Sequence, residues 1–127
     1  MPMYNVAVAA LAIGASRKWT DNVLSQHELP DVVSVRQGVA RRISYAALLR
    51  LAVIRQLHAQ LGIGVSNAVQ FAGALLESGQ AGVLETGQIS VRVDLRALRR
   101  TLDEGLAAAL ESTPARRRGR PPRKAQT

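Results

Sequence analysis

A helix-ending signal and a helix-starting signal follow each other within three residues, and they constrain the N-terminal part of this chain more than any other feature. Val6 to Ile13 is an alanine-rich apolar segment, and it ends at Gly14, a residue suited to the left-handed conformation that terminates helices. Ser16 is a residue type that caps the start of a helix, here one that begins at Arg17. The pattern predicts two short helices that meet across the turn Gly14-Ala15-Ser16.

The second helix carries a short apolar stripe and stops before Pro30-Asp31, where a different pattern begins. β-branched residues recur between Val32 and Ile43, with Gly38 near the middle of that segment. This pattern predicts a two-stranded ribbon that turns near Gln37-Gly38.

Two further helices follow the ribbon. Ser44 is placed to cap a helix over Tyr45–Leu61, in which apolar residues recur at helical spacing and which Gly62 ends. Ser66 is placed to start another helix, from Asn67 to about Glu77. The first 77 residues are therefore predicted to run helix, helix, ribbon, helix, helix.

A polar, glycine-rich break from Ser78 to Gly82 separates this part from the rest of the chain. The segments Val83-Leu84 and Ile89–Val93 predict a β-hairpin that turns around Glu85 to Gln88. Asp94 is placed to cap a last helix with a single apolar stripe. The stripe consists of Leu95, Leu98, Leu102, Leu106 and Leu110, and it lies opposite Arg96, Arg99 and Arg100. Either this chain or a second copy has to cover that stripe.

These elements predict a mainly α fold with a small β content. Residues 1–77 are expected to form a winged helix-turn-helix, and residues 78–112 a β-hairpin and helix that are a candidate dimerisation element. Residues 113–127 are expected to be a disordered basic tail. The total of 127 residues suits one compact unit with such an appendage.

The positive charge of the chain is concentrated at one end. The chain has 17 Lys and Arg against 9 Asp and Glu, a net charge of +8. Six of the basic residues and none of the acidic ones lie after Pro114, so the tail carries +6 and the remainder +2. A basic tail on a nearly neutral body indicates a polyanionic partner, either nucleic acid or an anionic membrane surface.

Several functional classes find no support in the residues. There are no cysteines, which excludes disulfides, thiolate metal sites and thiol chemistry. His27 and His58 lack partners at metal-ligand spacing, and no phosphate loop or nucleophile elbow is present, so we expect no metal, no cofactor and no enzyme activity. Arg50 interrupts Leu48 to Ile54, the best candidate for a membrane span, and no basic residue precedes the apolar segment Val6–Ala15. We therefore expect no membrane span and no secretory signal. A cytoplasmic, nucleoid-associated protein is the expected setting.

The second predicted helix has the content of a DNA-recognition helix. Ala10 and Gly14 are small enough to let the two helices pack closely, and the second helix then presents polar residues to base edges in the major groove. Arg17 and Lys18 suit phosphates or guanine, and Asn22 suits adenine. Asp21 repels phosphate. The chain has few aromatic residues, so Trp19 is interpreted as a core or interface residue and not as a stacking platform for single-stranded nucleic acid.

The order of these residues resembles that of MerR-like winged-helix proteins over about Tyr4 to Leu76. The resemblance is carried by the Gly14-Ala15-Ser16 turn, by Gly38-Val-Ala-Arg-Arg-Ile-Ser44 after the wing, and by Leu51-x-x-Ile54-x-x-Leu57 with Leu61-Gly62. It implies a homodimeric transcriptional regulator that binds double-stranded DNA sequence-specifically. The resemblance places Arg17, Lys18, Thr20 and Asn22 of the recognition helix in the major groove, and Arg36, Gln37, Arg41 and Arg42 of the wing on the backbone or an adjacent minor groove. The alternative for Arg41 and Arg42 is that they are solvated charges only.

The tail resembles an AT-hook. Gly119 leaves room for close approach to the groove floor, Arg118 and Arg120 extend along it in opposite directions, and Pro121-Pro122 keeps the strand extended. The narrow, negative A·T minor groove favours inserted arginines. The predicted DNA-binding residues of the tail are Arg116, Arg117, Arg118, Gly119, Arg120, Pro121, Arg123 and Lys124.

Two other functions fit the same sequence. An architectural, excisionase-like factor that bends DNA would use the same surfaces. A protein-interaction or antitoxin-like oligomerising module would use Val83 to Leu110 as its working surface, and its tail would only increase solubility.

Overall fold

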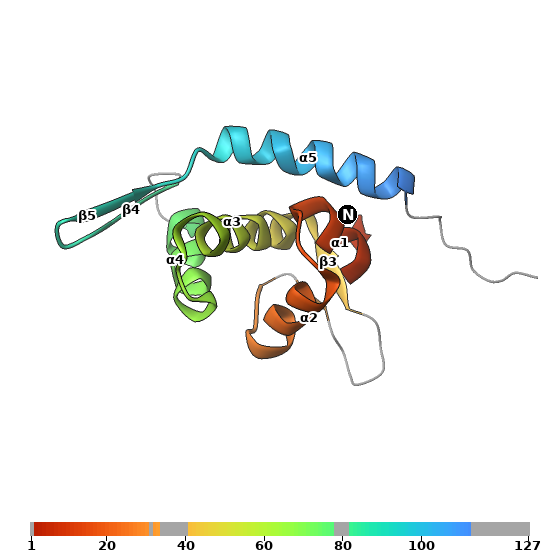
Figure 1. The fold of residues 1–127 in the computed structure, drawn as a ribbon, viewed down its shortest axis with the longest axis horizontal. Coiled ribbons are helices and arrows are strands. Elements are labelled where there is room, and N and C mark those ends of the chain that lie inside the picture. Colours follow the sequence, from red (N-terminus) through yellow and green to blue (C-terminus); the bar gives the residue numbers. More distant parts are fainter. Residues whose placement is uncertain (1, 31, 34–40, 78–81, 113–127) are drawn as a thin grey trace, which may run out of the picture.

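The fold is mainly helical, with five helices and two small antiparallel sheets in a computed structural model that describes residues 2–30, 32–33, 41–77 and 82–112 (Figure 1). This confirms the predicted balance of a mainly α fold with a small β content. The elements of the N-terminal part are β1 (Met3–Tyr4), α1 (Val6–Ile13), α2 (Arg17–Gln26), β2 (Val32–Val33) and β3 (Arg42–Ser44). The remaining elements are α3 (Tyr45–Leu61), α4 (Val65–Glu77), β4 (Val83–Thr86), β5 (Ile89–Arg92) and α5 (Leu95–Ser112).

The sharp turn between α1 and α2 forms as the sequence predicts. Gly14 adopts the left-handed conformation with φ of 73°, and its N–H closes the end of α1. The side chain of Ser16 accepts a hydrogen bond from the backbone N–H of Trp19 at 2.9 Å, which satisfies a donor in the first turn of α2. Helix α1 therefore ends, and helix α2 begins, where local capping chemistry places them.

A three-stranded sheet joins the start of the chain to the ribbon, in the order β1-β3-β2. Ile43 is fully buried in the central strand and lies opposite Tyr4 on one side and Val32 on the other. Strand β1 was not predicted, because two residues are too few to show an alternating pattern. The predicted turn of the ribbon near Gln37-Gly38 lies outside the described residues.

Helix α3 forms the centre of the core. Ser44 caps it, Gly62 ends it with φ of 68°, and Leu48, Leu51 and Ile54 are fully buried. Helix α4 begins at Val65, so the predicted start after Ser66 was wrong by two residues. An ion pair of 2.9 Å between Arg50 and Glu77 links the two helices.

The hairpin β4–β5 turns more tightly than predicted. Leu84 lies opposite Val91, Glu85 opposite Ser90 and Thr86 opposite Ile89, so only Gly87 and Gln88 remain for the turn. The four-residue turn expected at Glu85 to Gln88 was therefore wrong, because Glu85 and Thr86 belong to a strand. The hairpin extends beyond the ends of the neighbouring helices (Figure 1).

Helix α5 is covered by this same chain. Leu102, Leu106 and Ala109 are buried against the core formed with α1 and α3. The approach to α1 is so close that a Cβ atom at Gly105 would collide with the backbone oxygen of Ala12. The part of the leucine stripe that lies on α1 therefore needs no second copy to bury it.

One polar contact also holds α5. The hydroxyl of Tyr45 donates a hydrogen bond of 2.7 Å to the Asp103 carboxylate. Burial raises the pKa of Tyr45 to about 12, and the hydrogen bond to Asp103 contributes to the rise.

Within the described part of the chain, no helix is both long enough and apolar enough to cross a membrane.

Candidate nucleic-acid interface

Helix α2 has a buried face and a polar face. Thr20, Val23 and Leu24 are buried, three or four residues apart as helical geometry requires. The polar face consists of Arg17, Lys18, Asp21, Asn22, Ser25 and Gln26, all exposed except the half-buried Asp21. Because the buried face fixes the rotation of α2 on the body, the polar face is a fixed surface.

Trp19 anchors α2 to helix α3. Its ring lies 6.1 Å from the ring of His58, and the guanidinium carbon of Arg55 lies 5.1 Å from its centroid. Nδ1 of His58 lies 2.9 Å from the carbonyl oxygen of Ile63, within hydrogen-bond distance. Trp19 thus packs against the core, in line with the interpretation of this residue as a packing residue.

Two basic residues stand at the start of α2 with no compensating acid. Arg17 and Lys18 are exposed, the first turn of α2 contains no acidic residue, and neither side chain takes part in the ion pairs found among the described residues. Cations at a helix N-terminus oppose the helix dipole and slightly reduce helix stability. Their charge is therefore available to an external anion.

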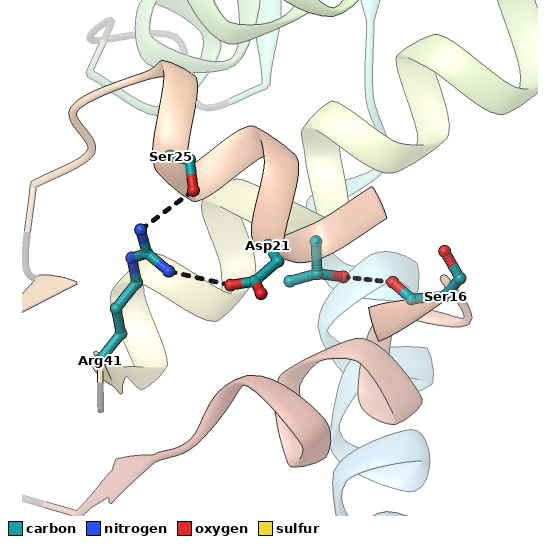
Figure 2. Close-up of polar contacts among 5 residues, drawn as sticks. Ser16, Asp21, Ser25 and Arg41 are labelled. Atoms are coloured by element: carbon teal, nitrogen blue, oxygen red, sulfur yellow. Dashed lines mark hydrogen bonds and ion pairs between the residues drawn. The ribbon is translucent and has the colours of Figure 1, made fainter. Parts of the chain in front are cut away.

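Asp21, the one acid on this face, is held by an arginine from the strand side of the site. Nη1 of Arg41 donates to Oδ1 of Asp21 at 2.8 Å, and Nη2 of Arg41 donates to Oγ of Ser25 at 3.1 Å. Figure 2 shows the guanidinium reaching both residues of α2. The pair removes the net negative charge that Asp21 would otherwise present to phosphate. Arg41 is thus neither a free wing cation nor a purely solvated charge.

The position of Thr20 corrects the predicted set of DNA contacts. Its side chain is fully buried, and its hydroxyl donates a hydrogen bond of 3.0 Å to the backbone oxygen of Ser16. Figure 2 shows this contact beside the labelled Ser16. Thr20 faces the core because it lies one turn before Val23 and Leu24 on the buried face, so it does not reach the surface.

The other predicted contacts divide between described and undescribed segments. Arg17, Lys18 and Asn22 share the polar face of α2, while Arg42 is exposed on β3 opposite Val33. Arg36 and Gln37 lie outside the described residues, as do Arg116 to Lys124. The structure brings Arg41 to α2 and gives no position for those remaining wing and tail residues.

The site also includes two residues that the sequence interpretation did not select. Ser25 and Gln26 are exposed on the same face, one turn beyond Asp21 and Asn22. Their spacing of four from those residues was the signal that could have identified them.

The described residues contain no cluster of three or more His, Cys, Asp or Glu that could hold a metal ion. What this surface offers is a pair of unpaired cations beside amide and hydroxyl groups on one helix face, a set suited to phosphates and base edges. Comparisons with protein-family models, with curated proteins and with solved structures find no match to this chain.

Proposed function

We propose that this protein is a sequence-specific double-stranded DNA-binding regulator of transcription, with a winged helix-turn-helix over residues 1–77. The observation that carries the proposal is the Arg41–Asp21 ion pair. It neutralises the only acid on a helix face that otherwise presents Arg17, Lys18 and Asn22 to solvent. A surface so arranged attracts a polyanion and still offers groups that discriminate between bases.

Helix α2 would lie in the major groove. Arg17 and Lys18 would contact phosphate or guanine, and Asn22 would contact adenine through its N6 and N7. Arg42 would contact the sugar-phosphate backbone from β3. The strand order β1-β3-β2 supports this docking, because β2 and β3 are the two strands that a wing extends.

The tail would bind an adjacent A·T-rich minor groove. Its Arg118-Gly119-Arg120-Pro121 sequence offers two cations with no side chain between them, as a narrow groove requires. Because the tail is covalently joined to the body, its binding would increase overall affinity through effective concentration. A homodimer would place two α2 helices on half-sites roughly 34–36 Å apart.

Selection of bound sequences from a random duplex pool, followed by fluorescence anisotropy at two salt concentrations, tests the proposal. The full chain should enrich one motif. Asn22→Ala should relax the preference at one position by about 1–3 kcal/mol. Asn67→Ala, an exposed asparagine on α4, is the matched control and should leave the preference unchanged. Enrichment of no motif despite salt-dependent binding would replace the regulator with an architectural factor.

Removal of residues 113–127 tests the tail separately. Loss of six cations should flatten the slope of log affinity against log salt concentration by up to about five units. Arg118→Ala with Arg120→Ala should remove the preference for A·T-rich flanks, while Arg116→Ala with Arg117→Ala, equal in charge, should reduce affinity on all flanks alike. An unchanged salt slope after truncation would contradict the tail's role.

A further inference from the structure

The hairpin β4–β5 has an apolar face that continues past the body of the protein. Leu84, Val91 and Val93 share this face and pack against the core. Ile89 lies two residues before Val91 on the same face, yet 64% of its surface is exposed. The apolar face is therefore covered at the root of the hairpin and uncovered at its tip.

The outer edge of β5 is unpaired within the described part of the chain. The N–H of Val93 donates to the carbonyl of Gly82 at 2.8 Å, so Val93 and, by strand alternation, Val91 and Ile89 direct their backbone groups toward β4. The N–H and C=O groups of Ser90 and Arg92 consequently point away from β4. No proline, lysine or bulge protects that edge, and such an edge is a template for another strand.

A cleft of about 360 Å³ opens beside the root of the same strand. Its walls include Val91 and Val93 of the hairpin, Leu57 and Leu61 of α3, and Leu98 of α5. Leu61 is 63% exposed. Leu61 and Ile89 are thus two strongly exposed large apolar residues of the described chain, one beside the cleft and one at the tip of the hairpin that borders it.

We propose that β5 pairs antiparallel with β5 of a second copy, with Val91 opposite the partner's Val91, to form a continuous four-stranded sheet. In this register Ile89 lies opposite the partner's Val93, so the apolar side chains of both β5 strands stay on the body-facing side of the sheet. Ser90 lies opposite the partner's Arg92, which brings together the backbone groups that point outward from each edge. A register shifted by one residue would put the apolar side chains of the two β5 strands on opposite faces and would leave the outward backbone groups without opposed partners.

The charges on the other face of the hairpin are also complementary in this register. Glu85 lies opposite Ser90, and Ser90 lies opposite the partner's Arg92. Strands are about 4.8 Å apart, so Glu85 and that arginine are separated by roughly 10 Å across a short serine. Two long side chains span this distance, and the two-fold symmetry forms the pair twice.

The pairing also accounts for the exposed apolar residues. Because the two hairpins point in opposite directions, the tip of each lies beside the root of the other. Ile89 then enters the cleft of the partner and covers the partner's Leu61. This interface gives the dimer that the proposed function requires, but it forms without DNA and is tested without it.

A single cysteine provides the sharpest test, because the chain has none. Opposed residues at a non-hydrogen-bonded position have Cα atoms about 4.5 Å apart, a separation that a disulfide spans. Full-length Val91→Cys with oxidised glutathione should form a covalent dimer, seen on non-reducing gels. Thr86→Cys, on the same face of the hairpin but on β4, should not. Cross-linking of Thr86→Cys to the same extent, or none of Val91→Cys, would overturn the proposed register.

Light scattering and sedimentation equilibrium test the interface without cross-linking. The full chain should have about twice the 13.6 kDa mass of one copy. Ser90→Pro removes one outward N–H and Ile89→Lys charges the tip, so each should weaken the dimer at least tenfold, with circular dichroism unchanged. Ser90→Ala, which keeps the N–H, should stay within twofold of the wild-type protein. A monomeric wild-type chain at 100 μM would refute the interface.

The charge pair has a reciprocal test. Glu85→Arg and Arg92→Glu should each weaken the dimer about fivefold, and the double variant should restore it to within twofold. Failure of the double variant to restore the dimer would refute the proposed pairing of charges and with it this register. A cross-linked Val91→Cys dimer that binds no duplex would contradict the proposed function and leave the interface standing. A wild-type monomer that binds its DNA motif would contradict the proposed interface and leave the proposed function standing.

Discussion

Helices α2 and α5 are both amphipathic and both begin with basic residues, yet the fold uses them differently. On α2, Arg17 and Lys18 are exposed, and the acid on their face is held by Arg41 from outside the helix. On α5, Arg96, Arg99 and Arg100 are exposed, but Asp103 and Glu104 follow in the next turn. The two helices lie on opposite sides of the body (Figure 1).

The comparison teaches that the number of arginines on a helix does not define a binding surface. Helix α5 carries more basic residues in its first two turns than α2 does, but its opposite face is fixed to α1 and its charges are largely balanced within the helix itself. A duplex that lies along α2 cannot also reach α5 on the other side. We therefore expect substitutions in α5 to change stability and substitutions in α2 to change affinity.

The largest effect is expected where α5 meets α1. Gly105→Val places a branched side chain against the backbone of Ala12 and should reduce the free energy of unfolding by about 3 kcal/mol. Ala108→Val, on the exposed side of the same helix, should cost only about 0.6 kcal/mol of helix propensity. Urea unfolding followed by circular dichroism measures both. Equal losses would mean that α5 does not pack on α1 in solution.

Removal of equal charge from the two helices should affect DNA binding unequally. Arg17→Ala with Lys18→Ala should lower duplex affinity by about 2 kcal/mol and reduce the salt slope by about 1.8 units, because two contacts are lost. Arg96→Ala with Arg100→Ala is the matched control, with an expected change below about 0.5 kcal/mol. Anisotropy titrations at several salt concentrations measure both slopes. A larger loss of duplex affinity from the α5 double variant would mean that the DNA binds α5 and not α2.

The Arg41–Asp21 pair should have a smaller effect on affinity. Arg41→Ala leaves Asp21 unpaired on the proposed interface, and we expect duplex affinity to fall by about 1 kcal/mol. Adding Asp21→Asn should recover most of that loss, since it removes the repulsion without restoring the cation. If the double variant binds no better than Arg41→Ala alone, then Arg41 acts as a direct contact and not through Asp21.

The smallest effect is expected at the Tyr45–Asp103 hydrogen bond. Tyr45→Phe should cost about 0.5 kcal/mol at neutral pH, a value reduced for the partial exposure of the bond. The pKa of Tyr45 is raised from 10.0 to about 12 in the folded protein, so the neutral phenol is favoured by folding. Its stabilising contribution is complete below pH 10 and is lost as the pH rises through about 12.

Urea unfolding at pH 8 and at pH 11 to 12 tests this expectation. The difference between the wild-type protein and Tyr45→Phe should shrink at the higher pH. Tyr4→Phe, which leaves the bond to Asp103 intact, is the control and should keep the wild-type dependence. A difference that stays constant with pH would contradict the role of the bond.

Local capping chemistry explains which elements could be predicted from the sequence. Ser16, Ser44 and Asp94 each cap the helix assigned to them, and Gly14 and Gly62 adopt the left-handed conformation expected at helix ends. These signals act within four residues of the backbone groups that they satisfy, so no distant contact is needed. The errors at Ser66 and at Glu85-Thr86 occurred where several polar residues could occupy the boundary.

The candidate site was predictable in part. Helix α2 and its polar Arg17, Lys18 and Asn22 follow from a helix start and a polar composition. The burial of Thr20 does not follow from that composition, because it depends on the face that α1 and α3 cover. The Arg41–Asp21 pair joins residues 20 positions apart, and no local pattern indicates it.

The sequence by itself determined the helices, the caps at Ser16, Ser44 and Asp94, the tight turn at Gly14-Ala15-Ser16 and the concentration of charge in the tail, since each depends on neighbours along the chain. Only the tertiary structure decided that α5 packs on α1, that Asp21 is neutralised by Arg41 just before β3 and that the outer edge of β5 is unpaired among the described residues. Those outcomes depend on which surfaces meet, and packing selects them by burying apolar area and satisfying polar groups across long separations in sequence.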